Sequence, residues 1–250
     1  MGLFHRIAHS IRLRHRIESS LLSPVRNWNK LTAATSFDKE LHREAHRDAA
    51  TYAYTHFRNA LYFNSKRSLY DWLLPRLEPK KGLMMEFGVY RAASLNYFAG
   101  KLPNHFWHGF DSFEGLPSDW SGGAKGRGAF SLGGKMPAVK RNVFLYPGWF
   151  HETLPAFMSA QKEKVAFVHL DADLYESTIS VLRVLQPALE EGSLLLFDEY
   201  FGQPGWRDNE HRAFTEWLKD NPGIEASCLA YASNGAVLFA LNERKTNSAD

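Results

Sequence analysis

The stretch that decides the fold is residues 165–198, which read VAFVHLDADLYESTISVLRVLQPALEEGSLLLFD. The first six residues are almost all apolar and predict a buried strand over 165–170. Residues 175–190 predict a helix that is kinked at Pro187, and residues 193–197 predict a second strand. A strand, a helix and a strand in succession are typical of two parallel strands joined by a crossover helix.

Working outward, the same alternation continues along the chain. Further strands are predicted over 83–87, 106–110, 143–146, 224–230 and 236–241, with helices over 92–99, 152–161 and 207–218. The last two strands are joined at Asn234-Gly235, a hairpin turn signal that predicts an antiparallel strand at one edge. Apolar strands alternating with helices indicate an α/β fold with a doubly wound, mostly parallel sheet.

The N-terminal third is predicted to be helical. Helices are expected over 38–62 and over 65–74, the second capped by Ser65 and stopped by Pro75. We therefore expect two domains, a helical N-terminal extension or lid over 1–80 and a catalytic domain over 81–250. Residues 118–135 are rich in glycine and predict a mobile loop with little means of packing.

The composition is that of a soluble globular protein. Of 250 residues, 44% are hydrophobic and 23% are charged. No apolar run reaches the roughly 18–20 residues that span a bilayer, and residues 1–20 lack the apolar core of a secretory signal. The single cysteine, Cys228, excludes an internal disulfide and is expected to be a buried structural thiol. These features together favour a cytoplasmic location.

Positive charge is concentrated at the N-terminus. Residues 1–30 hold six basic residues against one acidic residue, so the rest of the chain is slightly acidic. A nucleic-acid enzyme usually carries its basic patch on the body of the fold, so nucleic acid is not expected as a partner. Residues 1–22 could form an amphipathic helix in peripheral contact with a membrane. The alternative, which the thin apolar stripe favours, is packing on the domain or on another subunit of a homo-oligomer.

Acidic residues follow four of the predicted strands. They are Glu86, Asp111, the pair Asp171 and Asp173, and the pair Asp198 and Glu199. Ligands bind beyond the carboxyl ends of the strands in an open parallel sheet, and crowded acids repel one another unless cations lie among them. Taken singly, Asp173 could cap a helix, and the last pair could be turn residues. Taken together, the acids predict a binding site.

The turn after the first strong strand suggests what is bound. Residues 86–91 hold one glycine, Gly88, and match neither the dinucleotide fingerprint nor the phosphate loop. A single glycine lets the backbone approach a ligand, and Glu86 beside it suits a sulfonium rather than a pyrophosphate. Asp111 ends the next strand, where an acid typically accepts hydrogen bonds from a ribose. S-adenosylmethionine fits both observations.

At this point the sequence resembles the macrocin O-methyltransferase (TylF-like) family of class I methyltransferases over roughly residues 82–218. The resemblance rests on the stretches MEFGVY at 85–90, GFDSFEGLP at 109–117, GWFHETLP at 148–155, HLDADLYEST at 169–178 and FDEY at 197–200. It implies a seven-stranded, Rossmann-like sheet with an N-terminal helical cover. It also implies an O-methyltransferase that moves a methyl group from S-adenosylmethionine to a hydroxyl.

The resemblance further implies the residues of the site. Mg²⁺ or another divalent cation would be held by Asp171, Asp198 and Glu199, and Asp173 would be the general base. The cofactor site would comprise Glu86, Gly88, Tyr90, Asp111, Ser112 and Asp171. Family members commonly carry a second aspartate where this chain has Glu199, which makes Glu199 the ligand most open to question.

The acceptor is expected to be a small molecule or glycan, and the resemblance favours a sugar hydroxyl of a natural product or polysaccharide. The strongest alternative is a metal-dependent glycosyltransferase that uses Asp171-Ala172-Asp173, although the other acids would repel a nucleotide diphosphate. A non-catalytic binding domain and a metal-dependent hydrolase are weaker alternatives.

Several other side chains have two interpretations. His169 lies within a predicted strand and favours a buried histidine with satisfied hydrogen bonds, whereas His211 could face the acceptor. Trp149 and Trp206 favour core positions over sugar platforms. The basic residues of the glycine-rich loop could be solvated or could close over an acidic acceptor; they are Lys125, Arg127 and Lys135.

Overall fold

The structure is a computed structural model that describes residues 37–122 and 125–244. Two compact units divide the chain, residues 1–44 and residues 45–250. In the smaller unit the described residues, 37–44, are helical. The contact with a membrane or a partner that was predicted for residues 1–22 lies outside the described residues. Nowhere in the described ranges is there a helix of the length and apolarity that crossing a membrane requires.

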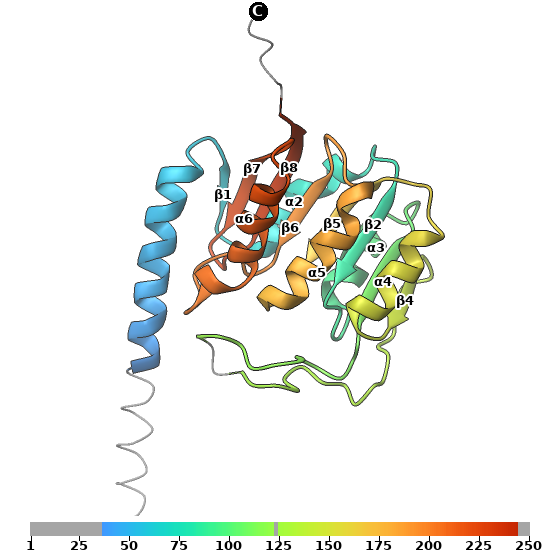
Figure 1. The fold of residues 1–250 in the computed structure, drawn as a ribbon, viewed down its shortest axis with the longest axis horizontal. Helices are drawn as coiled ribbons and strands as arrows, with labels where there is room; N and C mark the ends of the chain where they lie inside the picture. The colour runs from blue at the N-terminus through green and yellow to red at the C-terminus, as the bar shows by residue number, and fades with distance from the viewer. Residues whose placement is uncertain (1–36, 123–124, 245–250) are drawn as a thin grey trace, which may run out of the picture. The chain divides into compact units, whose positions relative to one another are not determined.

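The larger unit is built on an eight-stranded sheet with the order β1-β7-β8-β6-β5-β2-β3-β4 (Figure 1). The strands are β1 (Leu61–Phe63), β2 (Leu83–Phe87), β3 (Trp107–Asp111), β4 (Val143–Pro147), β5 (Val165–Leu170), β6 (Leu194–Phe197), β7 (Ile224–Ala232) and β8 (Val237–Glu243). Strand β8 is antiparallel to both β6 and β7, and the other pairs are parallel. The predicted doubly wound, mostly parallel sheet is confirmed.

Two details of the sheet differ from the prediction. The antiparallel strand β8 lies between β6 and β7 instead of at an edge. The sheet also has eight strands instead of seven, because residues 61–63 form β1 and not the end of a helix. The preceding helix ends at residue 56, and Leu61 pairs with Ala230 of β7. The spacing of the apolar residues matched a helix, but backbone pairing with a distant strand prevails at this edge.

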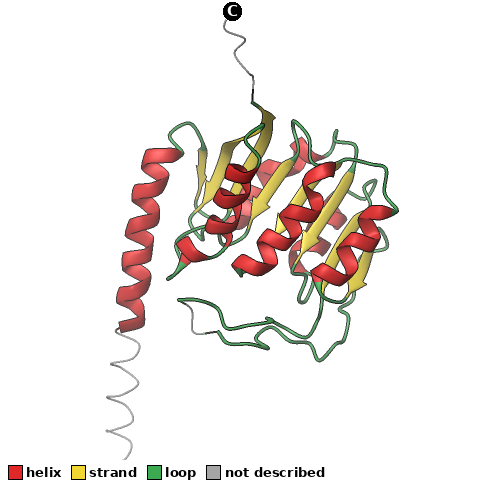
Figure 2. Cartoon of the chain, viewed as in Figure 1, coloured by secondary structure: helices red, strands yellow, loops and turns green. Residues whose placement is uncertain are grey.

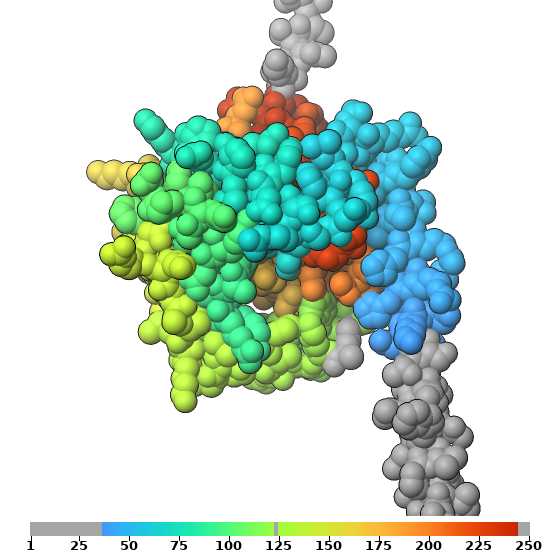
Figure 3. All heavy atoms as spheres, turned by 180° about the vertical axis from the view of Figure 1, so that it is seen from behind, coloured from blue at the N-terminus to red at the C-terminus, as the bar shows by residue number. Residues whose placement is uncertain are grey.

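Helices cover both faces of the sheet. On one face lie α4 (Phe150–Ser159), α5 (Tyr175–Leu185) and α6 (Glu210–Asp220), which share an apolar cluster with Ala49, Ala53 and Phe57. On the other face lie α2 (Lys66–Leu77) and α3 (Ala93–Lys101), which pack in a second apolar cluster; Figure 3 shows this face, with α2 in cyan. Residues 45–80 are thus part of the larger unit's core, and the proposed boundary at residue 80 stays a prediction.

Two prolines act differently from the prediction. Pro187 ends α5 at Leu185 and begins a short 3-10 helix (Gln186–Ala188), so it terminates the helix instead of kinking it. Pro75 lies inside α2, which continues to Leu77. Both Pro75 and Asp71, whose carbonyl loses its helical donor, are exposed, so water can supply the missing hydrogen bond. The predicted cap is confirmed, since the Ser65 side chain accepts from the Ser68 amide at 3.1 Å.

The glycine-rich loop between β3 and β4 makes packing contacts through a few of its residues, while most of its described residues are exposed, and its mobility stays a prediction. Figure 2 shows it running along the edge where the parallel strands end. Its two arms exchange backbone hydrogen bonds, because the Leu116 amide donates to Ala129 and the Gly128 amide donates to Leu116. Leu116, Trp120 and Leu174 form a small apolar cluster of their own. The loop therefore forms one wall over the sheet edge.

Candidate functional site

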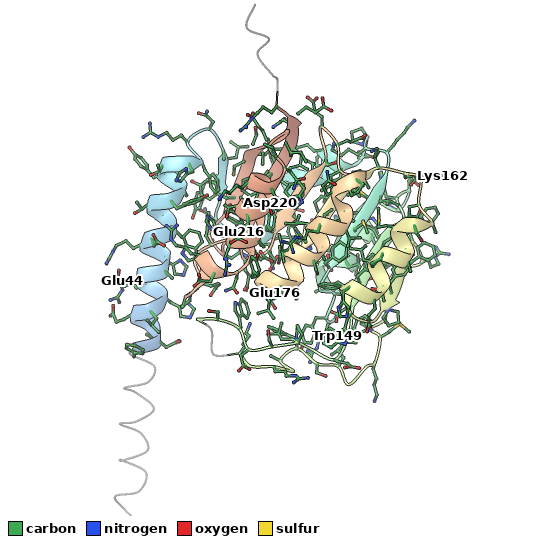
Figure 4. The ribbon with its side chains drawn as sticks, in the orientation of Figure 1. Glu44, Trp149, Lys162, Glu176, Glu216 and Asp220 are labelled. Carbon is green, nitrogen blue, oxygen red and sulfur yellow. The ribbon has the colours of Figure 1, made fainter. Side chains whose placement is uncertain are left out.

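A pocket of about 580 Å³ opens at the carboxyl edge of the parallel strands. This volume is in the range typical of small-molecule sites. Segments that follow β2, β3 and β5 line the pocket, together with the first turns of α4 and α5. Trp149 and Glu176, from those two turns, lie at the same edge in Figure 4. Parallel strands bring these segments together because all their carboxyl ends face one way.

One side of the pocket, which we call the turn side, consists of Gly88, Tyr90, Asp111 and Ser112. Tyr90 has a left-handed backbone with φ 47°, a conformation that is costly for a residue with a side chain. Asp111 holds the turn in this conformation. One carboxylate oxygen of Asp111 accepts from the Val89 amide at 2.8 Å and from the Tyr90 amide at 2.7 Å.

Asp111 also holds the start of the glycine-rich loop. Its other carboxylate oxygen accepts from the amide of Phe113 at 2.7 Å, and Phe113 is itself left-handed with φ 57°. The remaining acceptor position on that oxygen is available for a hydroxyl of a ligand. One side chain thus fixes two strained segments and still lines the pocket.

Gly88 joins the turn to the end of β5. Its φ is +88°, and a Cβ atom at this position would lie 1.8 Å from the carbonyl oxygen of Asp171. The Asp171 amide donates to Phe87 at 2.8 Å, which draws the two strand ends together. Only glycine permits this approach, and it brings Asp171 to the border of the turn side.

The other side of the pocket, which we call the acid side, consists of Asp171, Asp173 and Glu199. Burial and the charge of Asp198 raise the pKa of Asp171 well above its usual range. Burial and the charge of Glu199 raise the pKa of Asp173 to about 8. Burial and the charge of Asp198 raise the pKa of Glu199 to about 7. All three shifts arise because buried carboxylates crowd one another.

These acids lack donors within the described part of the chain. Glu199 Oε2 and Glu210 Oε1 are buried without a hydrogen-bond partner there, and the Asp171 and Asp173 carboxylates accept no hydrogen bond from a described residue. Asp173 also has a left-handed backbone with φ 60°. Buried acceptors without donors are rare in native proteins. The acid side therefore offers carboxylate oxygens, the ligands that a divalent cation prefers. Among the described residues, the group whose ligand atoms all lie within 4.8 Å of one another consists of Asp171 with His169 and Asp198.

A row of charged groups lies beneath the acid side, on the face of the sheet that α2 covers. His169 Nδ1 contacts Glu86 Oε2 at 2.8 Å, and His169 Nε2 contacts Asp198 Oδ1 at 3.2 Å. Lys66 Nζ, at the start of α2, donates to both Asp198 oxygens at 2.8 and 2.6 Å. The row of Glu86, His169, Asp198 and Lys66 alternates in charge.

His169 belongs to this row, and it also lies with Asp171 and Asp198 in a group that could hold an ion. Its Nδ1 atom faces Glu86, and its Nε2 atom faces Asp198 and lies 3.2 Å from Tyr70 Oη; a ring that donates to both carboxylates is positively charged. These two acids raise the pKa of His169 to about 10 against the opposing effect of burial. The prediction of a buried histidine with satisfied hydrogen bonds is confirmed.

Most of the predicted site residues line the pocket, and two of them do not. Gly88, Tyr90, Asp111, Ser112, Asp171, Asp173 and Glu199 all line the pocket. Glu86 does not, because its side chain is fully buried and accepts from Ser94 Oγ at 3.0 Å as well as pairing with His169. Asp198 does not line it either, because Lys66 and His169 hold its carboxylate. That Glu86 binds the cofactor therefore stays a prediction.

Sequence reasoning missed several residues of the site. Trp149 lines the pocket, although the sequence pattern favours a core position for it. Phe130 and Glu176 also line the pocket. Lys125 and Arg127 of the loop also line it, whereas Lys135 does not. The pairing of Lys66 with Asp198 spans 132 residues and leaves no local signal in the sequence.

Other ambiguous side chains are resolved. His211 packs among the rings of Tyr52, Tyr200 and Trp206 and does not line the pocket. Trp206 is buried in the core, as the pattern favours. Burial raises the pKa of Cys228 to about 12, which makes its thiol unreactive.

With the fold and the pocket described, comparisons place the chain among known proteins. Its fold is that of the class I methyltransferases. The crystal structure of CalS11, a calicheamicin methyltransferase, matches with a TM-score of 0.55 and 25% identity over 70% of this chain and 80% of that chain. The macrocin-O-methyltransferase (TylF) family model matches residues 135–228. The predicted resemblance to this family is confirmed.

Two relatives are similar at the sequence level. Demethyldecarbamoylnovobiocin O-methyltransferase of Streptomyces niveus is 31% identical over 53% of this chain and 58% of that protein. The 8-demethyl-8-(2,3-dimethoxy-alpha-L-rhamnosyl)-tetracenomycin-C 4'-O-methyltransferase of Streptomyces olivaceus is 31% identical over 48% of this chain and 53% of that protein. The chain thus spans about half the length of the curated relatives that it matches.

Proposed function

We propose that this protein is an S-adenosylmethionine-dependent O-methyltransferase that methylates a hydroxyl of a sugar in a natural product or polysaccharide, with a divalent cation at the acid side. The observation that carries the proposal is the two-sided pocket. One side is a glycine turn fixed by Asp111, and the other holds carboxylates that have no hydrogen-bond donor among the residues that the structure describes. The family resemblance and the rhamnosyl named in the tetracenomycin enzyme support a sugar acceptor.

The turn side is proposed to bind the cofactor. S-adenosylmethionine, when bound, supplies a methyl group on a positively charged sulfur. Gly88 leaves room for a ligand beside the backbone, and Asp111 keeps an acceptor position open for a ribose hydroxyl. The aromatic side chains of Tyr90 and Phe130, whose ring centroids are 5.6 Å apart, add apolar surface for the adenosyl group.

The acid side is proposed to activate the acceptor. Asp173 takes the proton of the hydroxyl. Burial and the charge of Glu199 raise the pKa of Asp173 to about 8 when no cation is bound. Asp171, Asp198 and Glu199 would hold a divalent cation. Such a cation, when bound, supplies Lewis acidity for the acceptor oxygen. The loop residues Lys125 and Arg127 line the same pocket and could approach an acidic acceptor.

The test is methyl transfer itself. The purified protein is incubated with S-adenosylmethionine and a panel of rhamnosides and other deoxysugar conjugates, and S-adenosylhomocysteine and the methylated product are measured by mass spectrometry. Product that gains one methyl group, that disappears in EDTA and that returns with Mg²⁺ is the expected result. Full turnover in EDTA would remove the cation from the proposal, and glycosyl transfer from a nucleotide sugar would replace the proposal altogether.

A further inference from the structure

Lys66 occupies a position that the proposed function does not explain. We propose that Lys66 is a built-in counter-ion that competes with a divalent cation for the Asp198 carboxylate, so that the cation binds fully only when the Lys66 ammonium leaves Asp198. This inference rests on the proposed function, because it concerns the cation of the same site.

The contact between the two side chains is close and specific. Lys66 Nζ lies 2.8 Å from Asp198 Oδ1 and 2.6 Å from Asp198 Oδ2. The side chain of Asp198 is 6% exposed and that of Lys66 is 36% exposed. The carboxylate is therefore buried, whereas the lysine stem keeps a path to solvent. This arrangement lets the ammonium leave without unfolding the helix that carries it.

The position of Lys66 in its helix indicates that Asp198 holds it there. Lys66 is the first residue of α2, directly after the cap Ser65. The amino end of a helix carries partial positive charge, which disfavours a cation, and the first turn of α2 holds no acid to offset it. Asp198, which follows β6 on the face that α2 covers, supplies the compensating negative charge. The pair is thus a tertiary contact and not a by-product of helix formation.

The Asp198 carboxylate has little acceptor capacity left. Besides Lys66, its Oδ1 atom accepts from Tyr70 Oη at 3.3 Å and contacts His169 Nε2 at 3.2 Å. A carboxylate offers about four acceptor positions, two on each oxygen. Three of these contacts fall on Oδ1, and Lys66 also takes one of the two positions on Oδ2, so the only position left lies beside the ammonium. A divalent cation bound to Oδ2 would also lie within a few ångströms of the ammonium, where like charges repel strongly. The two cations therefore exclude each other at Asp198.

The other acids stay free for a cation while Lys66 is in place. Asp171 and Glu199 line the pocket, and Glu199 Oε2 is buried without a partner among the described residues. These two can capture a cation first. Full coordination through Asp198 then requires the ammonium to move away. The free energy needed to displace the Lys66 ammonium lowers the affinity of the site for the divalent cation, compared with the same acidic residues without the lysine.

The experiment measures Mn²⁺ binding by the full chain, using the loss of the electron paramagnetic resonance signal of free Mn²⁺. Lys66→Met removes the ammonium and keeps the stem, and we expect it to bind Mn²⁺ about tenfold more tightly than the wild type. Lys80→Met is the matched control. Lys80 is also partly buried beside α2, but its Nζ donates to the Gly192 carbonyl at 2.6 Å, at the opposite end of β6. Its Mn²⁺ affinity should equal that of the wild type.

Lys66→Arg separates charge from shape and serves also if Lys66→Met does not fold. It keeps the cation, so its Mn²⁺ affinity should stay within about threefold of the wild type. Three results would overturn the inference: no Mn²⁺ binding by any folded variant, an unchanged or weaker affinity of Lys66→Met, or an arginine variant that binds at least tenfold more tightly than the wild type. S-adenosylmethionine is titrated in parallel without metal. Its failure to bind would contradict the proposed function. If it binds and no folded variant binds Mn²⁺, the cation of the proposed function is contradicted as well, whereas its binding together with either of the other two results would contradict the role of Lys66 alone.

Discussion

Acidic residues on the two sides of the pocket differ in the hydrogen-bond donors that surround them. On the turn side, Asp111 accepts from three backbone amides and is held in a network of hydrogen bonds. On the acid side, Asp171 and Asp173 have no donor among the described residues, and Glu199 has a buried oxygen without a partner. The chain therefore supplies the hydrogen bonds of the turn side by itself, whereas the acceptors of the acid side are left for a ligand.

The contrast extends to what lies beneath each side. The turn side rests on strained backbone that Asp111 stabilises, with Tyr90 and Phe113 in left-handed conformations. The acid side rests on the row that ends in Lys66, in which positive and negative groups alternate. The turn side can therefore bind an uncharged group through contacts that are already formed. On the acid side, the row beneath allows acidic residues to gather while the protein stays folded.

The largest expected effect comes from the acid side. Asp173→Asn removes the proposed base, so turnover should fall about 10²–10⁴-fold, whereas the affinity for S-adenosylmethionine should stay within about threefold. Steady-state kinetics and calorimetry measure the two quantities. Asp208→Asn is the matched control, because Asp208 is an exposed aspartate that does not line the pocket, and it should retain turnover. Equal losses in both variants would contradict a special role for Asp173.

A second variant tests the buried row against direct contact with the cofactor. Glu86→Gln leaves His169 without one of its two carboxylates, and breaking a buried pair should lower the free energy of unfolding by about 3–5 kcal/mol. Urea unfolding measures this loss. Because Glu86 does not line the pocket, the affinity for S-adenosylmethionine should change little in the folded protein. Loss of that affinity without loss of stability would return Glu86 to the cofactor site.

On the turn side, loss of the acidic residue should weaken the binding of S-adenosylmethionine. Asp111→Ala frees the Tyr90 and Phe113 amides and should weaken S-adenosylmethionine binding about 10–150-fold, which corresponds to roughly 1.5–3 kcal/mol for a charged hydrogen bond. Asp119→Ala is the control, since Asp119 also accepts a backbone amide, from Arg127 at 2.8 Å, but does not line the pocket. An unchanged affinity in Asp111→Ala would mean that the turn is fixed by other contacts.

A further prediction concerns the pH dependence of stability, which should differ between two histidines. Burial lowers the pKa of His108, on β3, to about 4. The unfolded chain therefore binds a proton that the folded protein does not as the pH falls from about 6.5 to 4, and stability decreases on acidification. His169 has its pKa raised to about 10, so its contribution is full below about 6.5 and is lost as the pH rises to 10.

Urea unfolding across pH measures both contributions. His108→Gln should flatten the acid limb of the stability curve by up to about 1.4 kcal/mol per pH unit, and His169→Gln should flatten the alkaline limb by a similar slope. If His169→Gln changes the acid limb instead, the imidazole is neutral in the folded protein and the charge alternation of the row is incorrect.

The sequence predicts the central strands well because their signals are local. Residues 83–87 and 165–170 are apolar runs bounded by turns, and both are strands with the predicted bounds. The edges of the fold are less predictable. Residues 61–63 fit a helical pattern, yet they form β1 because β7 lies beside them. Pairing between segments about 170 residues apart leaves no trace in local periodicity.

The site shows the same limit. The rule that ligands bind beyond strand ends places Asp111, Asp171 and Glu199 correctly at one pocket. It does not say which way each side chain turns. Glu86 and Asp198 also lie at strand ends, but they face the α2 side of the sheet, where His169 and Lys66 hold them. Such pairing depends on the face that each residue occupies and on a helix distant in sequence.

The measurement that tests the central claim most directly is calorimetric titration of the metal-free protein with S-adenosylmethionine, beside a titration with UDP-glucose and Mn²⁺. A turn side that is complete without a cation predicts micromolar binding of S-adenosylmethionine in EDTA and no binding of the nucleotide sugar. Absence of S-adenosylmethionine binding, together with UDP-glucose binding that requires Mn²⁺, would contradict the account and favour glycosyl transfer at Asp171 and Asp173.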